Sequence, residues 1–292
     1  MAVLMKRFQL FVLCAVVLFF GSMASVVNAD TFNSDGVEIF YTVRGQGESV
    51  VLVHGFTASG ASNFVQPGVA DGLASKYQVI TIDNRGHGAS GKPHDPAQYG
   101  EQMVEDVINL MDHLNIEKAR IVGYSMGGLI TQKLITLYPE RVVQAVSGGF
   151  GWGSDQEGGA LDNISTLADS LESGNGIGPL IVALTPPGQP QPTPEMLAQV
   201  NMMLMATNDP LALAAAVRSF GALADVSRET LGANKIPLMY IVGENDPLKA
   251  DVDRSRGVAG NAQYVVVPGS DHMTTFAQPL FLESIQKFFA MP

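Results

Sequence analysis

The chain has 292 residues, of which 46% are hydrophobic and 15% are charged. This apolar content is enough for a sizeable core and excludes an intrinsically disordered protein. The formal net charge of −11 argues against nucleic acid and against an anionic membrane surface as partners. The composition therefore predicts an ordered, globular chain.

The N-terminus has the three-part layout of a secretory signal peptide. Lys6 and Arg7 precede an apolar run at residues 8–20, and small residues follow as far as Ala29. We expect residues 1–29 to be cleaved after export to the periplasm or the medium, with no stable membrane insertion afterwards. A retained membrane anchor is the alternative, although the run is short for a span. The single cysteine, Cys14, lies in this segment, so the rest of the chain has no thiol nucleophile.

Strand-like and helix-like segments alternate after this leader. Short apolar runs typical of buried parallel strands are followed by segments of helical spacing. The predicted strands are 37–43, 49–53, 77–82, 119–122, 142–146, 237–242 and 263–267, and the predicted helices are 101–114, 129–138 and 280–289. Repeated strand–helix units predict one α/β domain.

The alternation is interrupted once, between residues 148 and 233. This stretch is helical and loop-like, and it includes a proline-rich run at 185–194. We interpret it as a helical cap inserted into an α/β core formed by residues 30–147 and 234–292. The proline-rich run is expected to be a stiff connector within the cap, with a plain surface loop as the alternative.

A Gly-x-Ser-x-Gly motif at residues 123–127 carries the clearest chemical signal. It follows the predicted strand 119–122 and precedes the predicted helix 129–138, and this strand–turn–helix context is what gives the motif its meaning. Gly123 and Gly127 leave room for a sharp turn. Ser125 is then exposed near a helix N-terminus, which favours developing negative charge. The bland alternative is a glycine-rich turn that happens to contain a serine.

A serine hydroxyl needs a base, and the base needs an orienting acid. Among the five histidines we choose His272, because it follows the last predicted strand and ligands of parallel sheets bind beyond the strand ends. For the acid we choose Asp246, which follows strand 237–242, with Glu244 as the alternative. The chain order nucleophile, acid, histidine is a known arrangement of such triads. Asp271, although next to His272, is expected to be solvated or structural.

Acyl transfer also requires donors for an oxyanion. The backbone N–H groups of Met126, directly after the serine, and of Phe56, after strand 49–53, are the predicted pair. His54 precedes this loop and is expected to hold it by hydrogen bonds, with a role as base as the alternative. For the substrate pocket we expect Trp152, Met202 and Met205, because methionines adapt to irregular apolar groups; packing of the cap onto the core is the alternative for these residues.

The sequence resembles the α/β-hydrolase superfamily over nearly all of residues 35–291. The motifs that carry the resemblance are His-Gly-Phe at 54–56, Asp-Asn-Arg-Gly-His-Gly-Ala-Ser at 83–90, Gly-Tyr-Ser-Met-Gly-Gly at 123–128, Gly-Glu-Asn-Asp at 243–246, and His272. The resemblance implies an eight-stranded, mostly parallel sheet with a helical lid. It also implies the roles given above for Ser125, Asp246, His272, Phe56 and Met126, and a structural role for the loop at 85–88.

Within that superfamily, haloalkane dehalogenases and epoxide hydrolases use aspartate where this chain has Ser125. The elbow and the Arg-Gly-His-Gly loop look most like those of esterases and lactonases. We therefore expect an exported serine hydrolase acting on small to medium uncharged esters, without cofactor or metal. The alternatives are a lactonase or carbon–carbon bond hydrolase with the same triad, and a binding or sensor protein with slow hydrolysis.

Overall fold

A computed structural model describes residues 27–153, 161 and 164–291. Eight strands form one sheet with the order β1-β2-β4-β3-β5-β6-β7-β8. Their bounds are Asn28–Ser34 (β1), Val37–Arg44 (β2), Ser49–Val53 (β3), Gln78–Ile82 (β4), Ala119–Tyr124 (β5), Val142–Gly148 (β6), Leu238–Gly243 (β7) and Gln263–Val267 (β8). Strand β2 pairs antiparallel with β1 and β4, whereas β3 to β8 are mutually parallel. The predicted eight-stranded, mostly parallel sheet is confirmed.

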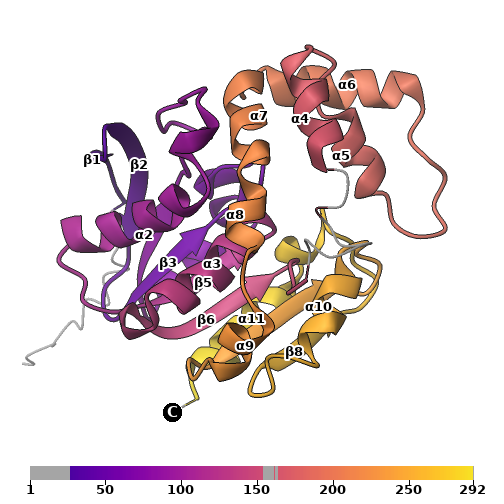
Figure 1. Ribbon diagram of the computed structural model, residues 1–292. Helices are drawn as coiled ribbons and strands as arrows, with labels where there is room; N and C mark the ends of the chain where they lie inside the picture. Colours follow the sequence, from indigo (N-terminus) through magenta and orange to yellow (C-terminus); the bar gives the residue numbers. More distant parts are fainter. Residues whose placement is uncertain (1–26, 154–160, 162–163, 292) are drawn as a thin grey trace, which may run out of the picture.

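Helices cover both faces of this sheet (Figure 1). They are α1 (Val69–Ala74), α2 (Glu101–His113), α3 (Met126–Leu137), α10 (Lys249–Ser255) and α11 (Pro279–Phe289). Alternate residues of β3 point to opposite faces. Val51 and Val53 belong to the core that includes α2 and α3, whereas Val50 and Leu52 belong to the core that includes α1 and α11. Strand β3 is apolar from Val50 to Val53 because both of its faces are buried.

Between β6 and β7, in the segment expected to form a cap, the described residues include six further helices. They are α4 (Ile164–Glu172), α5 (Gly178–Ala183), α6 (Pro194–Met205), α7 (Pro210–Arg218), α8 (Phe220–Ala224) and α9 (Arg228–Ala233). Figure 1 shows α4 to α7 gathered at one end of the sheet. Helix α7 packs against α4 and buries residues 212–217, whereas no residue of α6 is buried. The proline-rich run connects α5 to α6, and its last threonine, Thr193, caps α6 by accepting from the N–H of Met196.

The first strand differs from the prediction, which began the sheet at residue 37. Strand β1 precedes it and forms a hairpin with β2 through Asp35 and Gly36, both at positive φ. Asp-Gly is a strong signal for such a turn, because both turn residues adopt the left-handed region. The predicted leader lies outside the described residues except for residues 27–29, of which Asn28 and Ala29 open β1.

Across residues 27–153, 161 and 164–291, no single helix is long and apolar enough to cross a bilayer. Helices α6 and α7, bent by 98° relative to each other, satisfy the length and composition criteria only as a pair.

Candidate active site

Ser125 lies in the sharp turn between β5 and α3. Its φ of 54° and ψ of −117° are strained for a residue with a Cβ. The turn closes because Gly123 and Gly127 have no side chain: a Cβ on Gly123 would overlap the Gly127 carbonyl, and one on Gly127 would overlap the Val53 carbonyl. The N–H of Ser125 donates to the Gly148 carbonyl at 2.7 Å, which ties the turn to the neighbouring strand β6. The hydroxyl is thereby held at the N-terminus of α3.

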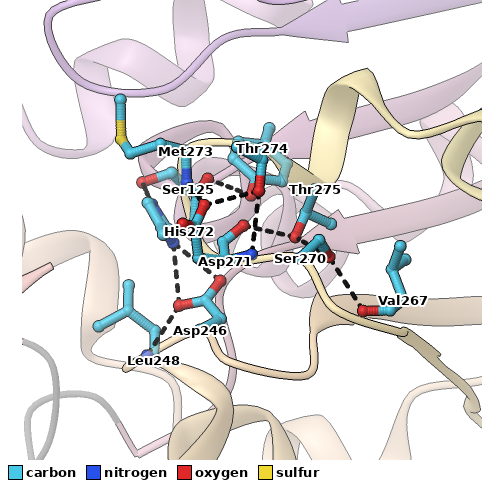
Figure 2. Close-up of polar contacts among 11 residues, drawn as sticks. Ser125, Asp246, Leu248, Val267, Ser270, Asp271, His272, Met273, Thr274 and Thr275 are labelled. Atoms are coloured by element: carbon cyan, nitrogen blue, oxygen red, sulfur yellow. Dashed lines mark hydrogen bonds and ion pairs between the residues drawn. The ribbon is translucent and has the colours of Figure 1, made fainter. Parts of the chain in front are cut away.

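His272 and Asp246 reach Ser125 from the loops that follow β8 and β7 (Figure 2). The Oγ of Ser125 lies 2.9 Å from Nε2 of His272, and Nδ1 of His272 lies 2.9 and 3.1 Å from the two carboxylate oxygens of Asp246. A carboxylate only accepts, so Nδ1 carries the proton and Nε2 is free to accept the serine proton. The structure thus brings the three predicted residues into one hydrogen-bonded chain.

Backbone contacts orient the acid. The N–H of Leu248 donates to Oδ1 of Asp246 at 2.8 Å, and the N–H of Asn245 donates to the Ser270 carbonyl at 2.9 Å, which joins the two loops. Glu244, the alternative acid, is exposed and accepts from the N–H of Gly269 at 2.8 Å. Asp246 is therefore the carboxylate that faces His272.

The oxyanion loop after β3 lies against the serine. A Cβ on Gly55 would lie 3.1 Å from the Cβ of Ser125, so only glycine allows this approach without displacement. Oδ1 of Asn63 accepts from the N–H of Gly55 at 2.8 Å and fixes the loop. Phe56 and Met126 both line the cavity beside Ser125, and their role as backbone oxyanion donors stays a prediction.

Two buried histidines, His54 and His87, pack against the oxyanion loop. His54 donates through Nδ1 to the Gly55 carbonyl at 2.7 Å and accepts through Nε2 from the N–H of Asn84 at 2.9 Å. His87 packs edge-on against both His54 and Phe56. Burial lowers the pKa of His54 to about 4 and, together with the charge of His54, lowers that of His87 to about 3. Both are neutral and structural near pH 7, and the alternative in which His54 is the base is not supported by its contacts.

These two pKa values predict an acid-sensitive fold. Both lie below the value of 6.5 for a free histidine, so the unfolded chain binds more protons as the pH falls. The free energy of unfolding should therefore decrease from about pH 6.5 down towards about pH 4, by up to about 1.4 kcal/mol per pH unit for each histidine. Urea unfolding across this range measures it.

A pair of histidine variants isolates the effect. His87→Asn should flatten the slope of unfolding free energy against pH, whereas His94→Gln, which alters a half-exposed histidine, should retain most of it. Equal slopes for the parent and His87→Asn would contradict the assignment.

An apolar cavity of about 60 Å³ opens beside Ser125. Oxyanion-loop and core residues form one wall, and residues from the segment before α4, from α4 and α5, and from α8 form much of the rest. The lining residues are Phe56, Ser125, Met126, Leu129, Phe150, Leu161, Ile164, Leu167, Leu180, Ala183, Leu184, Phe220 and Leu248. Ser125 is the one polar residue among these, and none of them is charged.

The lining differs from the predicted pocket of Trp152, Met202 and Met205. Trp152 instead borders a separate hollow of about 10 Å³ and donates through its indole N–H to the Val226 carbonyl at 2.7 Å. Met202 is 70% exposed on the outer surface of α6, and Met205 packs partly buried against the core. Helix α6 contacts α5, and the cavity lining includes residues of α5 but none of α6. Phe220 and Leu180 were missed because apolar residues occur throughout the cap and no periodicity singles them out.

In the described part of the chain, no group of three or more histidine, cysteine, aspartate or glutamate side chains is arranged to hold a metal ion.

Comparison with known proteins agrees with this fold. Residues 48–160 match the family model described as the alpha/beta hydrolase fold. Among curated proteins, the chain is 38% identical over 117 residues to 3-oxoadipate enol-lactonase 2 of Acinetobacter baylyi, covering 40% of this chain and 43% of that protein. The chain thus aligns with less than half of that relative's length. Residues 48–160 thus match this family model, and the described chain has the α/β-hydrolase fold.

Solved structures extend the likeness to almost the whole described chain. A bromoperoxidase from Bacillus anthracis superposes with a TM-score of 0.73 at 24% identity, covering 91% of this chain and 100% of that chain, which supports the fold alone. Est816, described as an N-acyl homoserine lactone degrading enzyme, superposes with a TM-score of 0.70 at 26% identity, covering 89% of this chain and 100% of that chain. The likeness therefore includes the cap as well as the core.

Proposed function

We propose that this protein is a serine hydrolase of carboxylic esters whose acyl group is uncharged and apolar. The observation that carries the proposal is the hydrogen-bonded chain from Asp246 through His272 to Ser125, which ends in an apolar cavity. A binding protein would require neither the tautomer that the Asp246 carboxylate imposes on His272 nor the strained backbone of Ser125.

The proposed reaction has two halves. Ser125 Oγ attacks the ester carbonyl carbon while His272 Nε2 takes its proton, and the resulting oxyanion lies near the N–H groups of Phe56 and Met126. The carbon–oxygen bond to the alcohol then breaks, and His272 returns the proton to the leaving oxygen. Water attacks the acyl-enzyme with His272 as base, and the carboxylic acid leaves as Ser125 is regenerated.

The cavity lining favours a neutral acyl group. A carboxylate that entered it would lose its hydration without meeting a cation among the lining residues, which is costly. The enol-lactonase relative is named for a lactone of 3-oxoadipate, a dicarboxylic acid whose enol-lactone keeps one carboxylate. This cavity does not match such a substrate. A neutral lactone is the second candidate, favoured by the likeness to Est816.

A pair of esters of equal length tests the charge preference. We expect kcat/KM for p-nitrophenyl butyrate to exceed that for the mono-p-nitrophenyl ester of succinic acid by about 100-fold or more, because the succinyl carboxylate must be desolvated. Initial rates of p-nitrophenol release measure both, and a neutral γ-lactone assayed in parallel tests the second candidate.

The variant Ala183→Lys provides the matched change for this assay. Ala183 borders the cavity and is exposed, so a lysine there keeps its ammonium group hydrated while facing the acyl group. In this variant, the ratio of kcat/KM for the butyrate ester to kcat/KM for the succinate ester should be smaller than in the parent protein. Comparable kcat/KM for the two esters with the parent protein would contradict the proposed acyl specificity.

A further inference from the structure

Tyr124, the residue between Gly123 and Ser125, contacts the loop that carries His272 and has no role in the reaction proposed above. Its hydroxyl donates to the main-chain carbonyl of His272 at 2.6 Å, and the side chain is buried with 2% exposed. The last residue of β5 is thus bonded directly to the loop that carries the base. His272 therefore has two hydrogen bonds to this turn: its side chain contacts the hydroxyl of Ser125, and its main-chain carbonyl accepts from the hydroxyl of Tyr124.

The ring of Tyr124 is held on several sides. It packs edge-on against Phe276 and Phe281, with ring centroids 5.1 and 5.9 Å away, and at a tilt of 40° against the imidazole of His272, 5.5 Å away. Gly149, at a φ of 62°, leaves the space: a Cβ there would lie 3.1 Å from Tyr124 Cζ and 3.2 Å from His272 Cε1. The phenol therefore has little freedom, and neither does the carbonyl it contacts.

Other contacts in this loop hold the neighbours of His272. Thr275 donates through its hydroxyl to the Asp271 carbonyl at 2.6 Å and contacts the Ser270 hydroxyl at 2.9 Å, and Asp271 accepts from Thr274 (Figure 2). Tyr124 acts on the main chain of His272 itself.

The phenol remains a donor throughout the working range of such an enzyme. Burial, and after it the negative charge of Asp246, raise the pKa of Tyr124 well above 10. A protonated hydroxyl always supplies the hydrogen bond that the His272 carbonyl accepts.

We propose that Tyr124 is a positioning residue for His272: its hydroxyl fixes the main chain of the base relative to the nucleophile. The inference rests on the proposed role of Ser125 and His272. The imidazole must accept a proton from Ser125 and then deliver it to the leaving oxygen, and small displacements of a catalytic group cost large factors in rate. The residue adjoining the nucleophile in sequence sets the position of a base that lies 148 residues away.

Tyr124→Phe tests this proposal, because it removes the hydroxyl and keeps the ring. We expect kcat to fall by about tenfold, with KM changed by less than about twofold, since the base is displaced but the cavity is not. The second-order rate at which a fluorophosphonate labels Ser125 should fall by a similar factor. Labelling requires the activation of Ser125 by His272 but no ester substrate, so it tests the role of Tyr124 even if the protein hydrolyses no ester. A failure to hydrolyse esters would count against the proposed function and not against the role of Tyr124.

Tyr240→Phe is the matched control. Tyr240 lies in β7, is fully buried, and donates to Oε1 of Gln132 at 3.1 Å, so its loss also removes one buried hydroxyl contact. The control should lower the melting temperature about as much as Tyr124→Phe while leaving kcat and labelling unchanged. The proposal is overturned if Tyr124→Phe keeps the parental rates, if both variants slow the reaction equally, or if Tyr124→Phe does not fold, since the hydroxyl would then serve stability.

Discussion

Ser125→Ala should lower kcat for ester hydrolysis by about 10⁵-fold and leave the protein folded. The alanine keeps the Cβ that already tolerates the strained turn, so the strand–turn–helix geometry is retained. What disappears is the oxygen that lies 2.9 Å from Nε2 of His272 and that would carry the acyl group. Residual rate would come from the oxyanion donors and from substrate binding. Steady-state rates and circular dichroism of both proteins measure the two halves of this expectation.

Ser90→Ala is the control for removing a buried serine hydroxyl. The Ser90 hydroxyl donates to the Asp83 carbonyl at 2.6 Å and accepts from the N–H of Phe40 at 2.9 Å, in the loop after β4. Its loss should reduce stability and leave kcat near the parental value. Ester turnover by Ser125→Ala at more than about one hundredth of the parental kcat would reject Ser125 as nucleophile. Absence of a fluorophosphonate adduct on the parent peptide containing Ser125 would reject it independently.

The core of the fold follows closely from local sequence. Buried parallel strands leave continuous apolar runs, and each run from β3 onward was predicted within two residues of its observed bounds. Strand β1 was missed because its residues are mostly exposed and polar, and because the leader pattern was extended to Ala29. The Asp-Gly turn at 35–36 was the available signal for the hairpin.

The three residues of the triad were predictable from their residue types and from their positions after predicted strands. A glycine-flanked serine after a strand and a histidine after the last strand are readable patterns, and the chain order of the triad fits an acid after strand β7. That order fits Asp246 and Glu244 equally, and it is the contact with His272 that separates them. The contacts that orient these groups join residues distant in sequence, as Tyr124 and His272 show, or pass through backbone atoms, as with Leu248. Residue types alone carry no signal for such contacts.

The cap was the part where sequence pattern failed. Apolar and polar residues are only weakly segregated around helix α6, so its spacing does not say which face meets the core. Met202 and Met205 were therefore placed in the pocket, whereas Met202 is exposed and Met205 packs against the core. The cap residues that do border the cavity come from the segment before α4, from α4, from α5 and its C-terminal end, and from α8, and only the packing of these segments brings them together.

Asp246→Asn should lower kcat by about 10³- to 10⁴-fold, because it moves the proton of neutral His272 from Nδ1 to Nε2. Oδ1 of Asp246 accepts from the N–H of Leu248, so the asparagine would place its carbonyl oxygen there. Its NH₂ group would then occupy the position 2.9 Å from Nδ1 of His272. Nδ1 would have to accept, the proton would move to Nε2, and Nε2 could no longer take the proton of Ser125. Steady-state kinetics at constant pH measure the loss.

Asp271→Asn separates the change of the His272 tautomer from the loss of a negative charge beside His272. Asp271 adjoins His272 in sequence, but its carboxylate accepts from the N–H of Met273 at 3.0 Å and from the Thr274 hydroxyl at 2.7 Å. An asparagine oxygen can accept both, and a half-exposed charge is screened by water, so kcat should stay within about threefold of the parent. If Asp271→Asn slowed the reaction as much as Asp246→Asn, charge near the imidazole would be the important factor. If only Asp246→Asn did so, the hydrogen bond that sets the tautomer of His272 is what the reaction requires.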